Sequence, residues 1–183
     1  MRIVVDRLWD GSPAAPEERV DLELRAVADG DLHIAVDAPF HGDPPPPSPP
    51  GPTPGLWNHE VVELFLYGDA DRYLEVELGP HGHHLVLALH GVRNVVREGL
   101  AIAFRRALAG TRWRGDAVVP AALLPVRPAR CNAHAIHGVA AARRYLSAIA
   151  AGGARPDFHR PEASAALEPA LLDALRRARP ANA

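Results

Sequence analysis

The fold of this chain is decided by the stretch Leu56-Trp-Asn-His-Glu-Val-Val-Glu-Leu-Phe-Leu-Tyr67 and its continuation Tyr73-Leu-Glu-Val-Glu-Leu78. Apolar and charged residues alternate in both halves, which is the period of a β-strand with one buried face. The connection Gly68-Asp-Ala-Asp71 consists of turn-forming residues. The two halves are therefore predicted to pair as an antiparallel hairpin.

The two faces of this hairpin differ in character. One face is aliphatic and carries Val62, Leu64, Leu66, Leu74, Val76 and Leu78. The opposite face is mixed and carries Val61, Glu63, Phe65, Tyr67, Tyr73, Glu75 and Glu77. Cross-strand neighbours have Cβ atoms only ~4.5–5.5 Å apart, so the three glutamates are expected to form an acidic cluster. A sheet face with such a cluster can bind a ligand.

Further short segments with strand periodicity occur along the chain. They are residues 3–5, 19–28, 32–37, 83–90, 92–97, 100–106, 111–119, 130–136 and 143–149. Asp29-Gly30-Asp31 marks a second hairpin, and the last two segments are alanine-rich, so a helix competes there. The pattern predicts an all-β protein, an antiparallel two-sheet β-sandwich of the jelly-roll kind over about residues 1–162.

Two segments stand apart from this pattern. Residues 39–55 are dominated by proline and are expected to form a stiff polyproline-II surface loop that folding does not need. Its Pro44-x-x-Pro47 spacing is also that of a ligand for an aromatic groove. Residues 163–183 are predicted to be an Ala/Arg-rich helical tail, with a short C-terminal helix at 169–179. We expect one domain spanning residues 1–183.

Composition excludes several classes of function. The chain has 183 residues, 48% of them apolar, and a net charge of −2, so it lacks the basic excess of a nucleic-acid-binding protein. All twenty basic residues are arginine, which excludes lysine-based chemistry. No segment reaches the ~20 apolar residues of a membrane span. With no export signal visible, we expect a cytoplasmic protein; the sequence does not indicate its oligomeric state.

Cofactor and catalytic motifs give little support to an enzyme. Ten histidines invite a zinc interpretation, but the groups around His81 and His134 lack the spacing of known zinc sites. The only methionine is Met1, which excludes haem held by Met and His. Cys131 is expected to be a small core residue. No serine-nucleophile elbow, phosphate-binding loop or dinucleotide fingerprint is present, so no cofactor and no metal are expected.

Three segments carry a family resemblance. They are Trp57-Asn-His-Glu-Val-Val-Glu-Leu-Phe-Leu66, Tyr73-Leu-Glu-Val-Glu-Leu-Gly-Pro-His-Gly82 and Pro156-Asp-Phe-His-Arg-Pro-Glu162. Their order resembles carbohydrate-binding modules of family nine and DOMON-like domains, in particular small free-standing DOMON-like proteins. The resemblance implies a two-sheet sandwich with a ligand-binding role, since relatives bind sugars and some bind haem. The chain departs from the pattern at Ala163-Ser164, where relatives often place an aromatic residue.

The candidate ligand-binding residues lie on the mixed face or match the family segments. They are Trp57, His59, Glu63, Tyr73, Glu75, Glu77 and His159. Trp57 can stack on a sugar ring or, alternatively, pack over the end of the sandwich. A second aromatic platform would come from Trp9, Trp113 or Tyr73.

Glu63 can be a ligand group or a buried structural carboxylate. A structural carboxylate needs a fixed partner, for which the candidates are Arg72, Arg93, Arg160, His59 and His159. We expect the structural role for Glu63, and an Arg-paired or solvated face for Glu75 and Glu77. His159 is expected either to pair with Glu63 or to hold the last loop in place.

Three functions compete on this reading of the sequence. The first is a non-catalytic β-sandwich that binds a small polar or carbohydrate-like ligand on the face of Glu63. The second is a small hydrolase that uses a His/Glu site on that face. The third is a protein-interaction module that uses its sheet or its proline loop. A pocket with Trp57, Tyr73 and Glu63 would favour the first, and a Glu–His pair with strongly shifted pKa values would favour the second.

Overall fold

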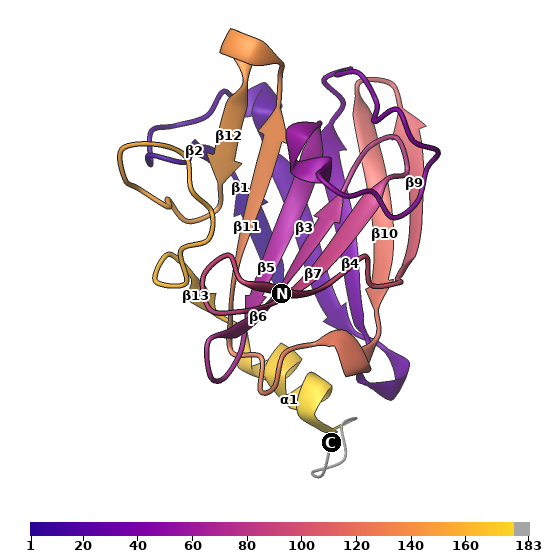
Figure 1. The fold of residues 1–183 in the computed structure, drawn as a ribbon, viewed down its shortest axis with the longest axis vertical. Coiled ribbons are helices and arrows are strands. Elements are labelled where there is room, and N and C mark those ends of the chain that lie inside the picture. Colours follow the sequence, from indigo (N-terminus) through magenta and orange to yellow (C-terminus); the bar gives the residue numbers. More distant parts are fainter. Residues whose placement is uncertain (178–183) are drawn as a thin grey trace.

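Two antiparallel sheets pack face to face in the computed structural model, which describes residues 1–177 (Figure 1). The smaller sheet has the strand order β1-β3-β4-β10-β9. Its strands are β1 (Arg2–Val5), β3 (Val20–Ala26), β4 (Leu32–Pro39), β10 (Arg112–Val119) and β9 (Ala103–Ala109). This arrangement confirms the predicted all-β sandwich.

The larger sheet carries the predicted hairpin of residues 61–67 and 73–78. Its order is β2-β12-β11-β5-β6-β7-β8, and the short β13 pairs with β11. Its strands are β2 (Arg7–Leu8), β12 (Arg144–Ser147), β11 (Arg130–His137), β5 (Val61–Tyr67), β6 (Arg72–Leu78), β7 (His84–His90), β8 (Val95–Glu98) and β13 (Ala165–Ala166). The adjacent β5 and β6 lie near the middle of this sheet, with β11 on one side and β7 on the other.

The central hairpin forms as predicted. Glu63 lies opposite Glu77, and Phe65 lies opposite Glu75. The turn between the strands has left-handed backbone at Ala70 and Asp71, which suits the right-handed twist of the paired strands. Gly68 is required at the start of this turn, because a Cβ there would lie 2.4 Å from the carbonyl oxygen of Val126.

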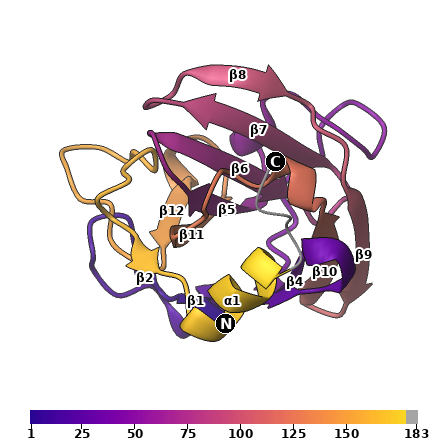
Figure 2. The same ribbon diagram turned by 90° about the horizontal axis from the view of Figure 1, so that it is seen from below.

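The main core lies between the two sheets. The aliphatic face of β5 and β6 packs there against β3, β4 and β10, and Trp113 is buried among these side chains. The helix α1 (Pro169–Arg177) covers one end of the sandwich, where Leu171 and Leu175 join the core (Figure 2). Burial of these side chains removes apolar surface from water and is the main force that holds the sheets together.

A second apolar cluster lies on the outer face of the larger sheet. Phe65, Tyr67 and Tyr73 pack there against Leu56 and Phe158. Leu56 belongs to the 3₁₀ turn Leu56–Asn58, and Phe158 belongs to the long segment after β12. Every residue of β5 is therefore buried, although the strand alternates in sequence, because loops cover the outer face.

Several predicted boundaries are wrong at the sheet edges. The segments predicted at 92–97 and 100–106 are displaced to β8 and β9. The reason is a turn in which Gly91 and Arg93 take left-handed backbone and His90 donates its amide hydrogen to Asn94 O at 3.0 Å. The tail predicted as helical from residue 163 begins instead with β13. The helix itself begins at Pro169, and the predicted residues 178–179 lie outside the described chain.

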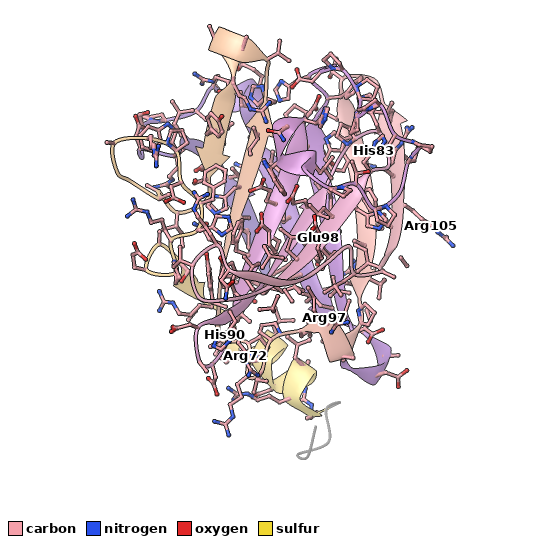
Figure 3. All side chains as sticks on the ribbon, in the orientation of Figure 1. Arg72, His83, His90, Arg97, Glu98 and Arg105 are labelled. Carbon is pink, nitrogen blue, oxygen red and sulfur yellow. The ribbon has the colours of Figure 1, made fainter. Side chains whose placement is uncertain are left out.

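The proline-rich segment packs on the domain instead of standing free. Its first residue, Pro39, ends β4. Thr53 donates its amide hydrogen to His84 O at 2.9 Å, and His84 donates to Gly51 O at 3.0 Å. His83, labelled in Figure 3, donates from Nε2 to Ser48 O at 2.9 Å. That folding does not need this loop stays a prediction.

Among the described helices, none has the length and apolar character needed to cross a bilayer.

Candidate functional site

A cavity of about 400 Å³ opens on the outer face of the larger sheet. Its floor comes from β5, β6, β7 and β11, and its walls come from the 3₁₀ turn before β5, from β12 and from the segments around residues 93 and 157. The lining residues are Trp57, Asn58, Glu63, Phe65, Glu75, Leu87, Arg93, Val95, Ile136, Arg143, Tyr145, Pro156, Asp157, Phe158 and His159. The outer face therefore combines apolar rings with carboxyl groups.

Trp57 stands at the cavity with its side chain 43% exposed. Arg143 holds the Trp57 turn in place, because its guanidinium donates to Trp57 O at 2.6 Å and to Asn58 O at 2.9 Å. The same guanidinium lies 5.8 Å from the centre of the Tyr145 ring, within cation–π range. Trp57 and Tyr145 therefore offer aromatic surface in a fixed frame.

Three glutamates meet on the floor of the site. Glu63, Glu75 and Glu77 each offer a carboxylate oxygen within 4.8 Å of the others. Their side chains are almost fully buried, with exposed fractions of 2%, 3% and 0%. Glu63 and Glu75 line the cavity, whereas Glu77 lies beneath it. Among residues 1–177, neither oxygen of Glu77 makes a hydrogen bond, and no hydrogen bond or ion pair reaches Glu63.

Burial raises the pKa of all three carboxyl groups. The pKa of Glu63 lies well above its usual range because of burial and the nearby Glu75, which outweigh the charge of Arg143. Burial raises the pKa of Glu75 to about 7. Burial and the other two carboxylates raise the pKa of Glu77 well above normal, although the backbone of Trp57 opposes the shift. The cluster is therefore not fully ionised at neutral pH without a cation.

His159 is oriented toward the carboxyl cluster by a chain of hydrogen bonds. Tyr73 accepts a hydrogen bond from the amide of Arg93 at 3.0 Å, so its hydroxyl hydrogen is free to go to His159 Nδ1 at 2.7 Å. We assign the ring proton to Nε2 on this ground. Nε2 lies 3.8 Å from Glu75 Oε2, and burial lowers the pKa of His159 to about 4. A neutral imidazole thus points its N–H at Glu75.

His134 completes the buried row beside Glu63. It lies directly opposite Glu63 across β11 and β5, and its Nδ1 lies 2.9 Å from Ser147 Oγ. Its ring stacks on Phe158 at 3.9 Å between centroids. Burial lowers the pKa of His134 to about 3, so this ring is neutral, and its Nε2 has no hydrogen-bond partner among the described residues.

Comparison with known proteins identifies relatives over most of the chain. No protein-family model matches the sequence. The rat UPF0462 protein C4orf33 homolog is 41% identical over 171 residues, which are 88% of this chain and 85% of the rat protein. The zebrafish homolog is 39% identical over 88% of this chain and 86% of its own length. The human UPF0462 protein C4orf33 is 39% identical over 87% of this chain and 83% of its own length.

The chain belongs to the UPF0462 family.

Solved structures resemble this UPF0462 member in fold. A candidate carbohydrate-binding protein from Bacteroides uniformis matches with a TM-score of 0.66 and 16% identity over 91% of this chain and 84% of that one. A family 9 carbohydrate-binding module from Caldicellulosiruptor kristjanssonii in complex with cellotriose matches with a TM-score of 0.50 and 14% identity over 76% of this chain and 70% of that one. These likenesses confirm the family-nine type of sandwich.

The structure of this UPF0462 chain brings most of the sequence-derived candidates together. Trp57, Glu63, Glu75 and His159 line one cavity. Tyr73 and Glu77 lie just behind it, Tyr73 as the hydrogen-bond partner of His159 and Glu77 as the deepest carboxyl group. His59 lies apart, because its Nδ1 donates to Pro44 O in the proline-rich loop at 3.3 Å.

Two of the alternatives stated for the site are wrong. Trp113 is 1% exposed in the inner core and offers no platform. His159 lies against Glu75 instead of pairing with Glu63, and its hydrogen bond with Tyr73 is consistent with the alternative role of holding the last loop.

The proposed structural partners of Glu63 also fail. Arg93 pairs with Asp157 at 2.7 Å, His59 bonds the proline-rich loop, and no ion pair joins Glu63 to Arg72 or Arg160 among the described residues. Glu75 and Glu77 are buried rather than solvated, and neither pairs with an arginine among residues 1–177. Within the same residues, Glu63 has none of the fixed partners that were expected for it.

Several lining residues were not singled out from the sequence. Arg143 and Tyr145 lie 86 and 88 residues after Trp57, and only the pairing of β11 with β5 and β12 places them near it. Phe158 belongs to the outer apolar cluster and also forms a wall of the cavity. The alternation of residues 143–149 marked a strand there, yet no local signal showed which face would meet Trp57.

Proposed function

We propose that this protein is a non-catalytic binding protein whose outer-face cavity holds a small polyhydroxylated, sugar-like ligand. The observation that carries the proposal is one cavity in which the exposed indole of Trp57 and the ring of Tyr145 stand beside the carboxyl groups of Glu63 and Glu75. Such a cavity offers a stacking surface and hydrogen-bonding groups at short range.

Sugar chemistry matches both halves of this cavity. A pyranose ring has an apolar face that an aromatic side chain covers well, and Trp57 is already held for that contact by Arg143. Ring hydroxyls donate hydrogen bonds, and Glu63 has no hydrogen-bond partner among residues 1–177 to compete for them. A cavity of about 400 Å³ suits one or two sugar rings.

The comparisons support the same class of ligand. The two family 9 modules of similar fold were solved in complex with cellotriose and with glucose. At 14% and 12% identity these structures are evidence for the fold alone. The proposed ligand class rests on the residues of the cavity. The DOMON half of the resemblance stays a prediction.

Isothermal titration calorimetry with glucose, galactose, xylose, cellobiose and cellotriose tests the proposal. We expect at least one saccharide to bind with a stoichiometry of one, and Trp57→Ala to weaken that binding at least tenfold. Leu108→Ala is the control, because Leu108 is similarly exposed, at 42%, on the other sheet. No binding by any saccharide, or equal binding by Trp57→Ala, would contradict the proposal.

A second candidate function is glycoside hydrolysis. It is favoured by the contact between Glu75 and His159, and by a Glu75 pKa of about 7, which suits a general acid at neutral pH. Incubation with nitrophenyl glycosides decides between the two functions. Turnover that disappears in Glu75→Gln would establish the hydrolase, and binding without turnover would leave the binding protein.

A further inference from the structure

Glu77 is the least explained group in the described structure. Its side chain is completely buried, and both of its oxygens lack a hydrogen-bond partner among residues 1–177. A buried carboxyl group without a hydrogen bond costs free energy, and the backbone of Trp57 offsets this only in part. Glu77 does not line the cavity, so a sugar hydroxyl above Glu63 and Glu75 would not reach it directly. A partner for Glu77 that enters from the cavity must therefore be smaller than a sugar.

The spacing of the three carboxyl groups fits a shared ion. Their nearest ligand atoms lie within 4.8 Å of one another, yet Glu75 Oε2 and both oxygens of Glu77 have no hydrogen-bond partner among residues 1–177. Calcium holds oxygen ligands at about 2.3–2.6 Å, so two oxygens on opposite sides of one ion lie about 4.6–5.2 Å apart and adjacent ones lie closer. The unpartnered carboxylate of Glu77 lies close to those of Glu63 and Glu75, which line the cavity.

We propose that Glu63, Glu75 and Glu77 together bind one hard divalent cation, with Ca²⁺ as the first candidate, at the floor of the cavity. An all-carboxylate ligand set favours Ca²⁺, Mg²⁺ or Mn²⁺ over softer metals. Ca²⁺ tolerates the irregular arrangement that three side chains from two paired strands provide, whereas Mg²⁺ demands a near-ideal octahedron. The open side of the ion faces the cavity, where water or ligand hydroxyls complete its coordination.

The arginines nearby form no direct ion pair with this cluster. Arg143 donates to the carbonyl oxygens of Trp57, Asn58 and Gly138. Arg93 pairs with Asp157 at 2.7 Å. Neither makes a hydrogen bond or ion pair with the three glutamates among the described residues, so the charges of Arg143 and Arg93 favour ionised Glu63 and Glu75 only from a distance.

His159 has the place of a supporting group for such a site. Its Nε2–H faces Glu75 Oε2 at 3.8 Å, and Tyr73 fixes the ring through Nδ1 at 2.7 Å. Metal-ligating carboxylates are commonly oriented by hydrogen-bond donors of this kind. Histidine spacing does not predict this site, because the proposed ligands are glutamates on adjacent strands.

Calorimetric titration of the chelator-treated protein with CaCl₂, MgCl₂, MnCl₂ and ZnCl₂ tests this inference. We expect one Ca²⁺ per chain, with at least tenfold weaker binding in Glu77→Gln and in Glu75→Gln. Glu98→Gln is the matched control, since Glu98 is an exposed carboxylate on β8 of the same sheet (Figure 3). Thermal unfolding of each metal-free variant verifies that it is folded.

The cation site and sugar binding can be separated experimentally. Saccharide titrations are run once with Ca²⁺ and once with EDTA. Sugar binding in EDTA with no cation binding tighter than millimolar would overturn the cation site and leave the proposed function. Cation binding without any sugar binding would support the cation site and overturn the proposed function. Equal Ca²⁺ affinity of the wild-type and Glu77→Gln proteins would also overturn the cation site.

Discussion

Glu18 and Glu77 are both buried glutamates, and their surroundings are opposite. Glu18 receives two hydrogen bonds from Arg144 at 2.8 Å, and His137 Nε2 lies 3.0 Å from Glu18 Oε1. These contacts lower the pKa of Glu18 to about 2. Glu77 has no such donor, and burial raises its pKa well above normal. The comparison shows that this fold can supply hydrogen-bond donors to a buried carboxylate, as it does for Glu18. The lack of such donors at Glu77 therefore favours a ligand-binding role for its cluster.

The largest effect is expected at Glu18. Glu18→Gln removes the charge that Arg144 and His137 face, and it should lower the free energy of unfolding by about 2–3 kcal/mol. Urea denaturation measures the change. Glu17→Gln is the control, because Glu17 is exposed beside it in the same 3₁₀ turn and should change stability by less than about 0.5 kcal/mol. If Glu18→Gln lowered the free energy of unfolding as little as Glu17→Gln does, the contrast between Glu18 and Glu77 would be wrong.

The pH dependence of the stability that Glu18 and Arg144 contribute gives a second prediction. The pKa of Glu18 is lowered from 4.5 to about 2 on folding, so its contribution to stability is present above pH 4.5 and is lost as pH falls toward 2. The difference in unfolding free energy between wild type and Glu18→Gln should therefore shrink steadily below pH 4.5. Because Arg144 is 39% exposed, solvent screening keeps the loss to about 1–2 kcal/mol. A difference that stays constant with pH would be the contrary result.

Two tyrosines of the outer face sharpen the comparison within the site. Tyr73→Phe removes hydrogen bonds to His159 and to the Arg93 amide, and it should cost about 1–2 kcal/mol. Tyr67→Phe is its matched control, because the Tyr67 hydroxyl is buried without a partner among residues 1–177. That substitution should be neutral or stabilising. Equal losses in the two variants would show that His159 is not held by Tyr73.

The smallest effect on stability is expected at Glu77. In metal-free protein, Glu77→Gln removes no hydrogen bond and no ion pair, and it should change the free energy of unfolding by less than about 1 kcal/mol. Thermal denaturation in EDTA provides the measurement. A loss of several kcal/mol would mean that Glu77 has a structural role after all, as Glu18 has.

Local periodicity predicted the fold well, and it placed the acidic cluster. The alternation in residues 61–67 and 73–78 was enough to place Glu63 and Glu77 on one face, because successive side chains of a strand point to opposite faces of the sheet. The same rule could not show that loops bury this face. Covering it depends on Leu56 and on Phe158, which meet over the sheet only after the whole large sheet has formed.

Long-range pairing decided the remaining parts of the site. Trp113 lies on the apolar face of its strand with Gly115, Ala117 and Val119, but the local sequence does not show which sheet this strand joins, and therefore whether that face meets the inner core or the cavity. Tyr145 reaches the cavity through the pairing of β12 with β11. No spacing in the sequence distinguishes these outcomes, since each depends on which strands become neighbours.

The most direct test of the central claim uses the three tryptophans as reporters. Each indole N–H gives its own peak in a ¹H–¹⁵N correlation spectrum, and Trp57→Phe assigns the peak of Trp57. Trp57 lines the cavity, Trp113 is buried in the inner core, and Trp9 packs beside the outer cluster without lining the cavity. Titration with the saccharide panel should move the Trp57 peak in a saturable manner and leave the Trp113 peak in place. Saturable binding that leaves the Trp57 peak unmoved, or a panel that moves no peak, would contradict the account.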